Sequence, residues 1–224
     1  MSDGAATGAA PALDPVAAAG TLLAWLSPGF PVGAFAWSHG LEAAVAAGEA
    51  ADRDGFRDWL AAVVAQGAGR SDAVLLAAAW RDPAAAGPAE LAAALQPSAE
   101  RRAESLTQGA AFARVAGEAW GVAFPPAAYP VAVGRAARAA GVPLEMAAAL
   151  YVQAFAANLV AAALRLFPLG ETAGQGVLAE LAPLIRETAA QAVAADPEDL
   201  GGACLGADLA SMRHESLQPR LFRS

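Results

Sequence analysis

Residues 146–164 read MAAALYVQAFAANLVAAAL, and they decide the fold class of this 224-residue chain. The stretch carries no charged side chain, and its length is close to the ~20 residues that a membrane-spanning helix needs. It contains Gln153 and Asn158, however, and its flanks, Glu145 and Arg165, form no basic anchor. A helix that is apolar on all sides also suits the centre of a large bundle. We predict that buried position, because no other segment is expected to be able to span a membrane.

A buried helix from about Leu144 to Phe167 has two consequences for stability. Asn158 should find a hydrogen-bond partner in the core, since an unpaired buried amide costs ~1–3 kcal/mol. Leucine in place of Ala157 or Ala161 should overpack the bundle and cost ~1–3 kcal/mol.

Alanine supplies much of the 57% hydrophobic fraction of the chain. It is the strongest helix former and has little side-chain area, so this composition favours closely packed helices. No window of alternating β-branched residues, internal repeat or linker competes with this pattern. The sequence therefore predicts an all-α fold, a single-domain helical bundle of about ten helices.

Caps, prolines and periodicity set the ends of the other helices. Asp14 followed by Pro15 predicts a helix that runs to about Leu26. The spacing of apolar residues from Phe56 to Val64 is typical of an amphipathic helix. Further helices are predicted from Ser38 to Gly48, from a cap at Ser71 to before Pro83, over 88–96, over 98–120, on either side of Gly141, over 173–195 with a kink or split at Pro183, and after a cap at Asp208.

Residues 1–14 are predicted to be a disordered leader, and residues 15–224 a single all-helical domain. The leader lacks the basic and apolar regions of a secretory signal. The single cysteine, Cys204, excludes intrachain disulfides and favours a reducing compartment. We therefore expect a cytoplasmic protein that is not held in a membrane.

The net charge of −8 argues against nucleic acid as a partner, because nucleic-acid binding needs a basic surface. All 14 basic residues are arginine. A chain without lysine has neither a Schiff-base lysine nor a phosphate-loop lysine.

No group of residues forms a recognisable catalytic or metal site. The two histidines, His39 and His214, are far apart in sequence, and Cys204 lies among small residues that suggest packing. His39 and Glu42 are spaced to share a helix face, as in di-iron bundles, but no second helix repeats the motif. We interpret His39 as a capping or interface histidine. The sequence predicts no enzyme activity, no bound metal and no cofactor.

Two segments carry residue types that commonly anchor protein interfaces. The segment from Phe30 to Trp37 holds three aromatic residues, and it either folds into the core or lies exposed. Residues 213–224 hold three arginines against one glutamate. Residues 220–224 are expected to contribute little to the core and to order on binding, with Phe222 filling a pocket of a partner.

Four segments, taken together and in this order, resemble the UreF family of urease accessory proteins. Trp37 stands where that family usually has tyrosine, and Glu171 where it commonly has glutamine. The segments are Leu22-Leu23 with Ser27-Pro28-Gly29-Phe30-Pro31-Val32-Gly33-Ala34-Phe35 and Ser38-His39-Gly40-Leu41-Glu42; Arg102, Glu104, Gln108 and Gly109; Asn158, Ala163-Leu164-Arg165-Leu166, Pro168-Leu169-Gly170 and Gly174-Gln175; and Met212, His214-Glu215 and Arg220-Leu221-Phe222-Arg223-Ser224.

The resemblance implies a homodimer that takes part in urease maturation. It implies a non-enzymatic adaptor that bridges a UreD/UreH-like protein and the nickel-carrying GTPase UreG during nickel incorporation into apo-urease. Separately, the two distant histidines, the lone cysteine and the absence of lysine predict that the isolated chain binds neither nickel nor GTP tightly. The alternative is a GTPase-activating regulator of UreG that supplies Arg220 or Arg223. The residues expected to bind partners are Phe30, Pro31, Phe35, Trp37, His39, Glu42, Glu104, Gln108, Arg165, Gln175, His214, Glu215, Arg220, Leu221, Phe222 and Arg223.

Overall fold

The computed structural model describes residues 11–200 and 204–224. Over this part of the chain the fold is all-α, with ten α-helices, two short 3₁₀ helices and no strand, as the sequence predicts. The helices are α1 (Pro15–Trp25), η1 (Ala34–Ala36), α2 (Leu41–Ala46), α3 (Arg53–Gln66), α4 (Ala68–Arg81), α5 (Gly87–Ala94), α6 (Ala99–Trp120), α7 (Tyr129–Ala139), α8 (Leu144–Leu166), α9 (Glu171–Ala194), η2 (Pro197–Asp199) and α10 (Leu205–His214).

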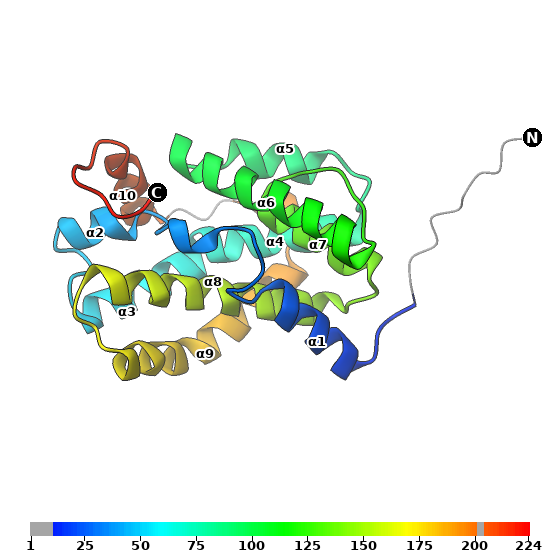
Figure 1. Ribbon diagram of the computed structural model, residues 1–224, viewed down its shortest axis with the longest axis horizontal. Helices are drawn as coiled ribbons and strands as arrows, with labels where there is room; N and C mark the ends of the chain where they lie inside the picture. The colour runs from blue at the N-terminus through cyan, green and yellow to red at the C-terminus, as the bar shows by residue number, and fades with distance from the viewer. Residues whose placement is uncertain (1–10, 201–203) are drawn as a thin grey trace, which may run out of the picture.

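The helix α4 lies at the centre of the bundle and packs against α3, α5, α7, α8 and α9. Its closest neighbour is α7, where a Cβ on Gly134 would lie 2.3 Å from the carbonyl oxygen of Leu76. A larger residue at Gly134 would therefore separate the two backbones. Figure 1 shows α1 at one end of the bundle, and α2, α10 and the C terminus at the other.

Only one side of α8 is buried, although nearly all of its residues are apolar. Ala147, Ala148 and Ala156 are completely buried. Asn158 and Ala161 are exposed, so the expectation of a core position for Asn158 is wrong. The stretch is apolar on all sides because alanine lines much of its open side, and the small apolar area of an alanine side chain makes its exposure to water cost little.

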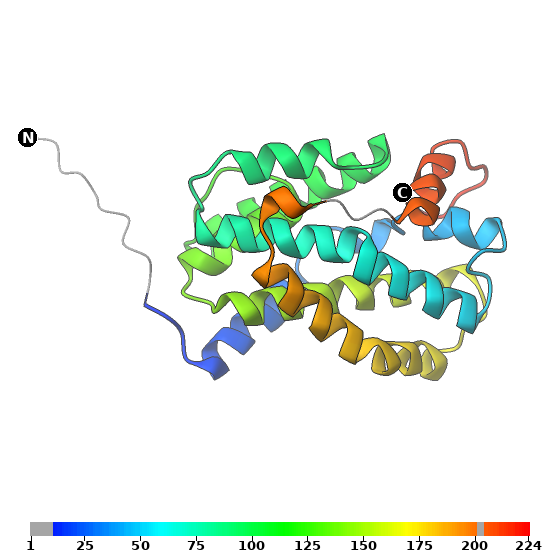
Figure 2. The same ribbon diagram turned by 180° about the vertical axis from the view of Figure 1, so that it is seen from behind.

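Two helical stretches, Arg53–Arg81 and Leu144–Leu166, are long and apolar enough to cross a membrane by length and composition. The expectation of a single such stretch is therefore wrong. About half of each stretch is buried inside the protein, 56% and 50% of the most apolar window. The first is the run of α3 and α4, which meet at Gly67 and cross the middle of the view in Figure 2. Core helices of a bundle pass the same test, so length and composition are only weak evidence that these helices span a membrane.

An aromatic cluster joins α1, the following loop, α6 and α7. The ring of Phe112 lies 5.7 Å from Trp25, 5.2 Å from Phe30 and 5.8 Å from Tyr129. The sequence left open whether the loop folds into the core or lies exposed, and the structure shows that it does both. Phe30, Val32 and Trp37 are buried, and Phe35 is 78% exposed.

Most predicted helix ends agree with the structure, and two predicted caps are wrong. Asp14 accepts hydrogen bonds at the start of α1, and Ser98 does the same for α6. Ser71 lies inside α4, which already begins at Ala68. Asp208 lies in the first turn of α10, which begins at Leu205. Both residues have cap-forming side chains, but the chain had already turned into a helix upstream of each.

Two other predicted helices differ from the observed ones in extent or continuity. The helix expected from Ser38 begins only at Leu41, because His39 and Gly40 have positive φ angles. The helix α9 runs through Pro183 without interruption. Residues 1–10 of the predicted leader lie outside the described residues. Near its end, the amide of Leu13 donates to the carbonyl of Gly141 at 2.8 Å, so this part of the leader contacts the helical domain.

Candidate functional site

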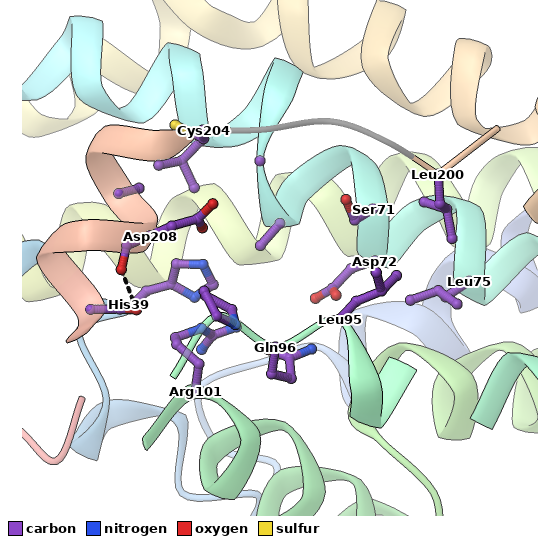
Figure 3. A pocket seen from close by; sticks show the side chains of 16 residues that line it. His39, Ser71, Asp72, Leu75, Leu95, Gln96, Arg101, Leu200, Cys204 and Asp208 are labelled. Carbon is purple, nitrogen blue, oxygen red and sulfur yellow. Dashed lines mark hydrogen bonds between the residues drawn. The ribbon is translucent and has the colours of Figure 1, made fainter. Parts of the chain in front are cut away.

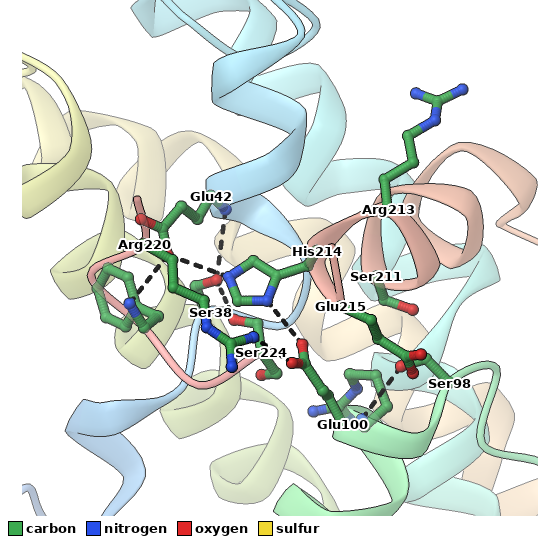
Figure 4. A network of polar contacts seen from close by, with 12 residues as sticks. Ser38, Glu42, Ser98, Glu100, Ser211, Arg213, His214, Glu215, Arg220 and Ser224 are labelled. Atoms are coloured by element: carbon green, nitrogen blue, oxygen red, sulfur yellow. Dashed lines mark hydrogen bonds and ion pairs between the residues drawn. The ribbon is translucent and has the colours of Figure 1, made fainter. Parts of the chain in front are cut away.

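Residues 205–224, which we call the C-terminal segment, fold back onto the loop before α2 and the N-terminal turn of α6. The segment consists of α10 and a ten-residue tail without regular structure. Figure 4 shows His214 between Glu42 on α2 and Glu100 on α6, whereas Arg213 points away from both. The contacts join parts of the chain that are up to 186 residues apart.

Glu42 binds the backbone of the tail. Its Oε1 accepts the amide of Leu221 at 2.6 Å, and its Oε2 accepts the amide of Phe222 at 2.9 Å. Burial raises the pKa of Glu42, but hydrogen bonds from Leu221, His214 and Phe222 together outweigh it, so the pKa lies below its usual value. The carboxylate is therefore ionised where it holds the tail.

His214, the last residue of α10, is completely buried between two carboxylates. Its Nε2 lies 3.0 Å from Glu42 Oε2, and its Nδ1 lies 2.6 Å from Glu100 Oε2. Glu100 also forms an ion pair with Arg220 of the tail. The ring thus joins α10 to two other helices.

The end of the tail is bound by the turn before α2 and by α6. The backbone oxygen of Ser224 accepts from the amide of Ser38 at 2.9 Å and from its hydroxyl. The Ser224 hydroxyl donates to Glu104 at 2.6 Å, and Glu104 forms a buried ion pair with Arg101. Each polar group of Ser224 named here has a partner, which is what burial requires.

Phe222 packs its ring inside the protein and is 3% exposed. The guanidinium of Arg165 lies 4.2 Å from the ring centroid, and it also donates to the carbonyl of Phe35 at 2.6 Å. The guanidinium of Arg223 lies 4.8 Å from the ring of Trp37. The expectation that the tail contributes little to the core is therefore wrong for Phe222, whose aromatic ring finds a pocket within its own chain.

The turn Ser38–Leu41 brings α2 against α10. The amide of Leu41 donates to the carbonyl of Ser38 at 3.0 Å, and His39 and Gly40 between them have φ angles of 60° and 79°. A Cβ on Gly40 would lie 2.8 Å from the backbone nitrogen of Ser211 in α10. Glycine is therefore required both by the turn and by the close approach of the two backbones.

A cavity of about 100 Å³ lies behind this turn, between α10, α4 and the start of α6. Figure 3 shows His39, Asp72 and Arg101 facing it together with Ser71 and Asp208. Burial, and then the charge of Arg101, lower the pKa of His39 well below its usual value. Burial raises the pKa of Asp72 to about 6, although the charge of Arg101 opposes this. The Nδ1 of His39 has no hydrogen-bond partner among the described residues.

The UreF family profile matches residues 50–182 of the chain. Several relatives match almost the whole length. "Urease accessory protein UreF" of Cereibacter sphaeroides is 52% identical over 206 residues, which cover 91% of this chain and 97% of the relative. The protein of the same name from Roseobacter denitrificans is 48% identical over 91% of this chain and 93% of the relative, and "Urease accessory protein UreF 1" of Brucella canis is 46% identical over 94% and 96%.

The chain belongs to the UreF family. The resemblance stated from four sequence segments is thus confirmed at the level of the family. The family profile does not reach the turn at Ser38 or the C-terminal segment, but the relatives match enough of the chain to extend beyond residues 50–182.

In this UreF-family chain, most residues predicted to bind partners gather around the C-terminal segment. Of these, Phe30, Trp37, His39, Glu42, Glu104, Gln108, His214 and Phe222 are buried, whereas Pro31, Phe35, Arg165, Glu215, Arg220, Leu221 and Arg223 are exposed. Gln175 is exposed on α9 and has no contact with the segment among those described. The surface thus consists of exposed side chains held in place by a buried polar network.

Three residues of the buried polar network around the C-terminal segment were not predicted from the sequence. Glu100 is one of them, because an acidic residue in the first turn of a helix is accounted for by the helix dipole and gives no sign of a distant partner. Ser224 received no role of its own. The buried arginine of α6 is Arg101, while Arg102, the residue matched to the family pattern, is exposed.

The described residues of this UreF-family chain contain no group of three or more His, Cys, Asp or Glu side chains that could hold a metal ion. His39 lies in the turn before α2 and therefore does not share a helix face with Glu42, as the spacing had suggested. Cys204 is half-buried at the start of α10, and burial raises the pKa of its thiol. A raised pKa makes the reactive thiolate scarcer, which agrees with a packing role.

Proposed function

We propose that this protein is a non-enzymatic, cytoplasmic adaptor in urease maturation, acting as a homodimer. It would bridge a UreD/UreH-like protein and the nickel-carrying GTPase UreG while nickel enters apo-urease. The observation that carries the proposal is the C-terminal segment, whose exposed Leu221 and Arg223 lie next to the loop that carries the exposed Phe35. Aromatic and arginine side chains such as Phe35 and Arg223 are enriched at protein interfaces.

The buried network supports an adaptor because it fixes these side chains before a partner arrives. The amide of Arg223 donates to the carbonyl of Ala36 at 2.9 Å, which joins the tail to the loop that carries Phe35. A preformed surface loses less conformational entropy on binding than a disordered one. The packing of the tail therefore supports a surface that is ordered before a partner binds, in place of the predicted tail that orders on binding.

The alternative, a GTPase-activating regulator, requires an arginine free to enter the active site of another protein. Arg220 pairs with Glu100, and Arg223 lies over the ring of Trp37. These contacts favour the adaptor, since either arginine would have to leave its place. Multiple-turnover GTP hydrolysis by the GTPase should change less than tenfold when this protein is added, whereas an activator would raise it by about 10³–10⁵.

The adaptor role is tested by binding of purified UreD/UreH-like and UreG proteins to two matched double variants. Phe35→Ala with Leu221→Ala removes exposed apolar groups beside the C-terminal segment, and Val16→Ala with Leu23→Ala removes exposed groups of α1 at the opposite end. The first pair should weaken binding by about tenfold or more, as loss of an anchor does. Equal binding by both variants would contradict the proposed surface, and absence of any binding by the unmodified chain would contradict the adaptor role itself.

A further inference from the structure

Asp72 on α4 is a buried carboxylate whose hydrogen-bond partner is neutral. The residue is 6% exposed, and its Oδ2 accepts from the hydroxyl of Tyr151 at 2.9 Å. The guanidinium of Arg101, whose charge acts on Asp72, forms its ion pair with Glu104 instead. Aspartate is almost never buried unless it is paired. The surroundings of Asp72 therefore favour one more positive charge.

A second carboxylate, on Asp208 of α10, lines the same cavity of about 100 Å³ as Asp72 (Figure 3). Within residues 11–200 and 204–224, neither aspartate forms an ion pair. Arg101 also lines the cavity, but Glu104 already balances its charge. Burial raises the pKa of both aspartates, to about 6 for Asp72. At neutral pH the cavity therefore has an excess of negative charge.

His39 supplies a further acceptor to this cavity. Its ring faces the cavity in Figure 3, and the residue is 7% exposed. Burial, and then the charge of Arg101, lower its pKa, so the ring is neutral and one of its nitrogens accepts a hydrogen bond. The Nδ1 atom has no partner among the described residues, and a buried polar atom is costly when it stays unpaired. An acceptor beside two carboxylates favours a ligand with several N–H donors.

The apolar walls of the cavity indicate a cation that is attached to a hydrocarbon chain. They include Val63, Leu75, Leu95, Leu200 and Ala207. In the part of the chain that the structure describes, no group of three or more His, Cys, Asp or Glu side chains could hold a metal ion. A guanidinium has five N–H donors in a planar fork, so it can bind acceptors on different helices at once. It is also more weakly hydrated than an ammonium, which favours its transfer into a partly closed cavity.

We propose that this cavity binds an alkylguanidinium group, with the guanidinium between Asp72, Asp208 and His39 and the alkyl chain along the leucines. Leu95 at the edge of the cavity is 44% exposed, and Asp208 is half-buried, so a ligand can enter from this side. The group can belong to an arginine side chain of another protein or to a free guanidino compound. The binding is a property of the isolated chain, so its test can fail or succeed independently of the adaptor role.

The direct test is an NMR titration of the whole ¹⁵N-labelled chain with ethylguanidinium at pH 7.5 and constant ionic strength. The amides of Ser71, Asp72 and Ala207 should shift with one common dissociation constant, on the order of 1 mM or lower. Amides of α1, at the opposite end of the bundle, should not shift. Ethylurea has the same shape without the charge, and it should bind at least roughly tenfold more weakly, because charge-assisted hydrogen bonds are the stronger ones.

A second titration distinguishes the two sources of the guanidinium group. N-acetyl-arginine methylamide carries the group on a peptide backbone, as a protein would. If it binds as tightly as ethylguanidinium, the cavity accepts an arginine side chain. If only ethylguanidinium binds, the walls exclude a peptide backbone and the ligand is a free compound. Either result supports the alkylguanidinium site.

Three variants separate binding in the cavity from a general effect of charge. Asp72→Asn and Asp208→Asn should each weaken the binding of ethylguanidinium by roughly fivefold or more, since each removes a charged acceptor. Glu145→Gln removes one negative charge from an exposed position on α8 and should leave the binding unchanged. The proposal is overturned if ethylguanidinium causes no shifts at the cavity, if ethylurea binds equally well, or if both aspartate variants bind as tightly as Glu145→Gln.

Discussion

The carboxylate of Glu42 accepts the backbone amide of Phe222 at 2.9 Å, although 180 residues of sequence separate the two. This hydrogen bond connects the first polar residue of α2 with the only aromatic residue of the tail. It places the ring of Phe222 beside Arg165 and leaves Leu221 facing solvent. One buried carboxylate thereby determines which tail side chain is core and which is surface.

Replacement of Glu42 by alanine should be strongly destabilising. The change leaves the amides of Leu221 and Phe222 and one side of His214 without an acceptor, and an unpaired buried donor costs about 1–3 kcal/mol. The free energy of unfolding, measured by urea denaturation, should fall by about 3 kcal/mol. The control is Glu49→Ala, which removes a more exposed ion pair with Arg213 and should cost less than about 1 kcal/mol. Equal losses would mean that Glu42 does not hold the tail.

Replacement of Phe222 by alanine should lower stability even without any partner protein. The ring is 3% exposed, and truncation of a buried phenylalanine typically costs about 3–5 kcal/mol. Leu221→Ala, one residue away and 55% exposed, should cost less than about 1 kcal/mol. A thermal melt of both variants checks this, and an unchanged melt for Phe222→Ala would show that the tail is not packed in solution.

The contrast between local and distant contacts explains how far the sequence allowed the fold to be predicted. The apolar spacing from Phe56 to Val64 identified α3 because helix periodicity is a local property, and all five apolar residues of that pattern are buried. The composition of α8 could not tell its two sides apart, which is why Asn158 was misplaced. Ser71 failed as a cap because a serine side chain suits a helix start without requiring one.

The candidate site was predictable only in part, for the same physical reason. Family resemblance pointed to Glu42 and His214 but not to their contact, since that pairing joins residues 172 apart. Glu100 gave no pattern beyond its place at a helix start. Burial of the tail could not be read from its composition, because Phe222 between arginines suits a partner's pocket and a pocket of its own chain equally well.

Alanine in place of Gly40 should disrupt the contact between α2 and α10. The residue has a φ of 79°, and a Cβ would meet the backbone of Ser211 at 2.8 Å. The matched control is Gly48→Ala, where φ is 77° but no atom lies within 4 Å of the added Cβ. The left-handed backbone alone costs about 1–2 kcal/mol in both variants. The melting temperature of Gly40→Ala should therefore fall clearly below that of Gly48→Ala, and equal values would contradict the close approach.

Asp72 should make folding stability depend on pH between about 4 and 6. Burial raises its pKa to about 6 in the folded protein, above the usual value of 3.8. The folded state therefore binds more protons than the unfolded state in this window, so Asp72 favours folding at pH 4 and opposes it increasingly up to pH 6. Asp72→Asn keeps an oxygen for the hydroxyl of Tyr151, which donates to Asp72 at 2.9 Å, and removes the titration.

The measurement for Asp72 is the difference in unfolding free energy between Asp72→Asn and the unmodified chain, taken at several pH values. This difference should move in favour of the variant by an amount on the order of 2–3 kcal/mol between pH 4 and pH 6, and then stay level. Other carboxylates cancel in the difference. A flat difference would show that Asp72 titrates alike in the folded and unfolded chain.

Leucine substitutions along α8 should separate its buried side from its open side. Ala156 is completely buried, and Ala156→Leu should overpack the core and cost about 1–3 kcal/mol. Ala161 is exposed and lines a groove of about 200 Å³ with Phe35 and Arg165, so Ala161→Leu should change stability by less than about 0.5 kcal/mol. Urea denaturation of the two variants decides between this and the expectation from composition, in which α8 is packed on every side. An equally large loss for Ala161→Leu would mean that its side of α8 is covered in solution, and a dependence of that loss on protein concentration would identify the cover as a second copy of the chain.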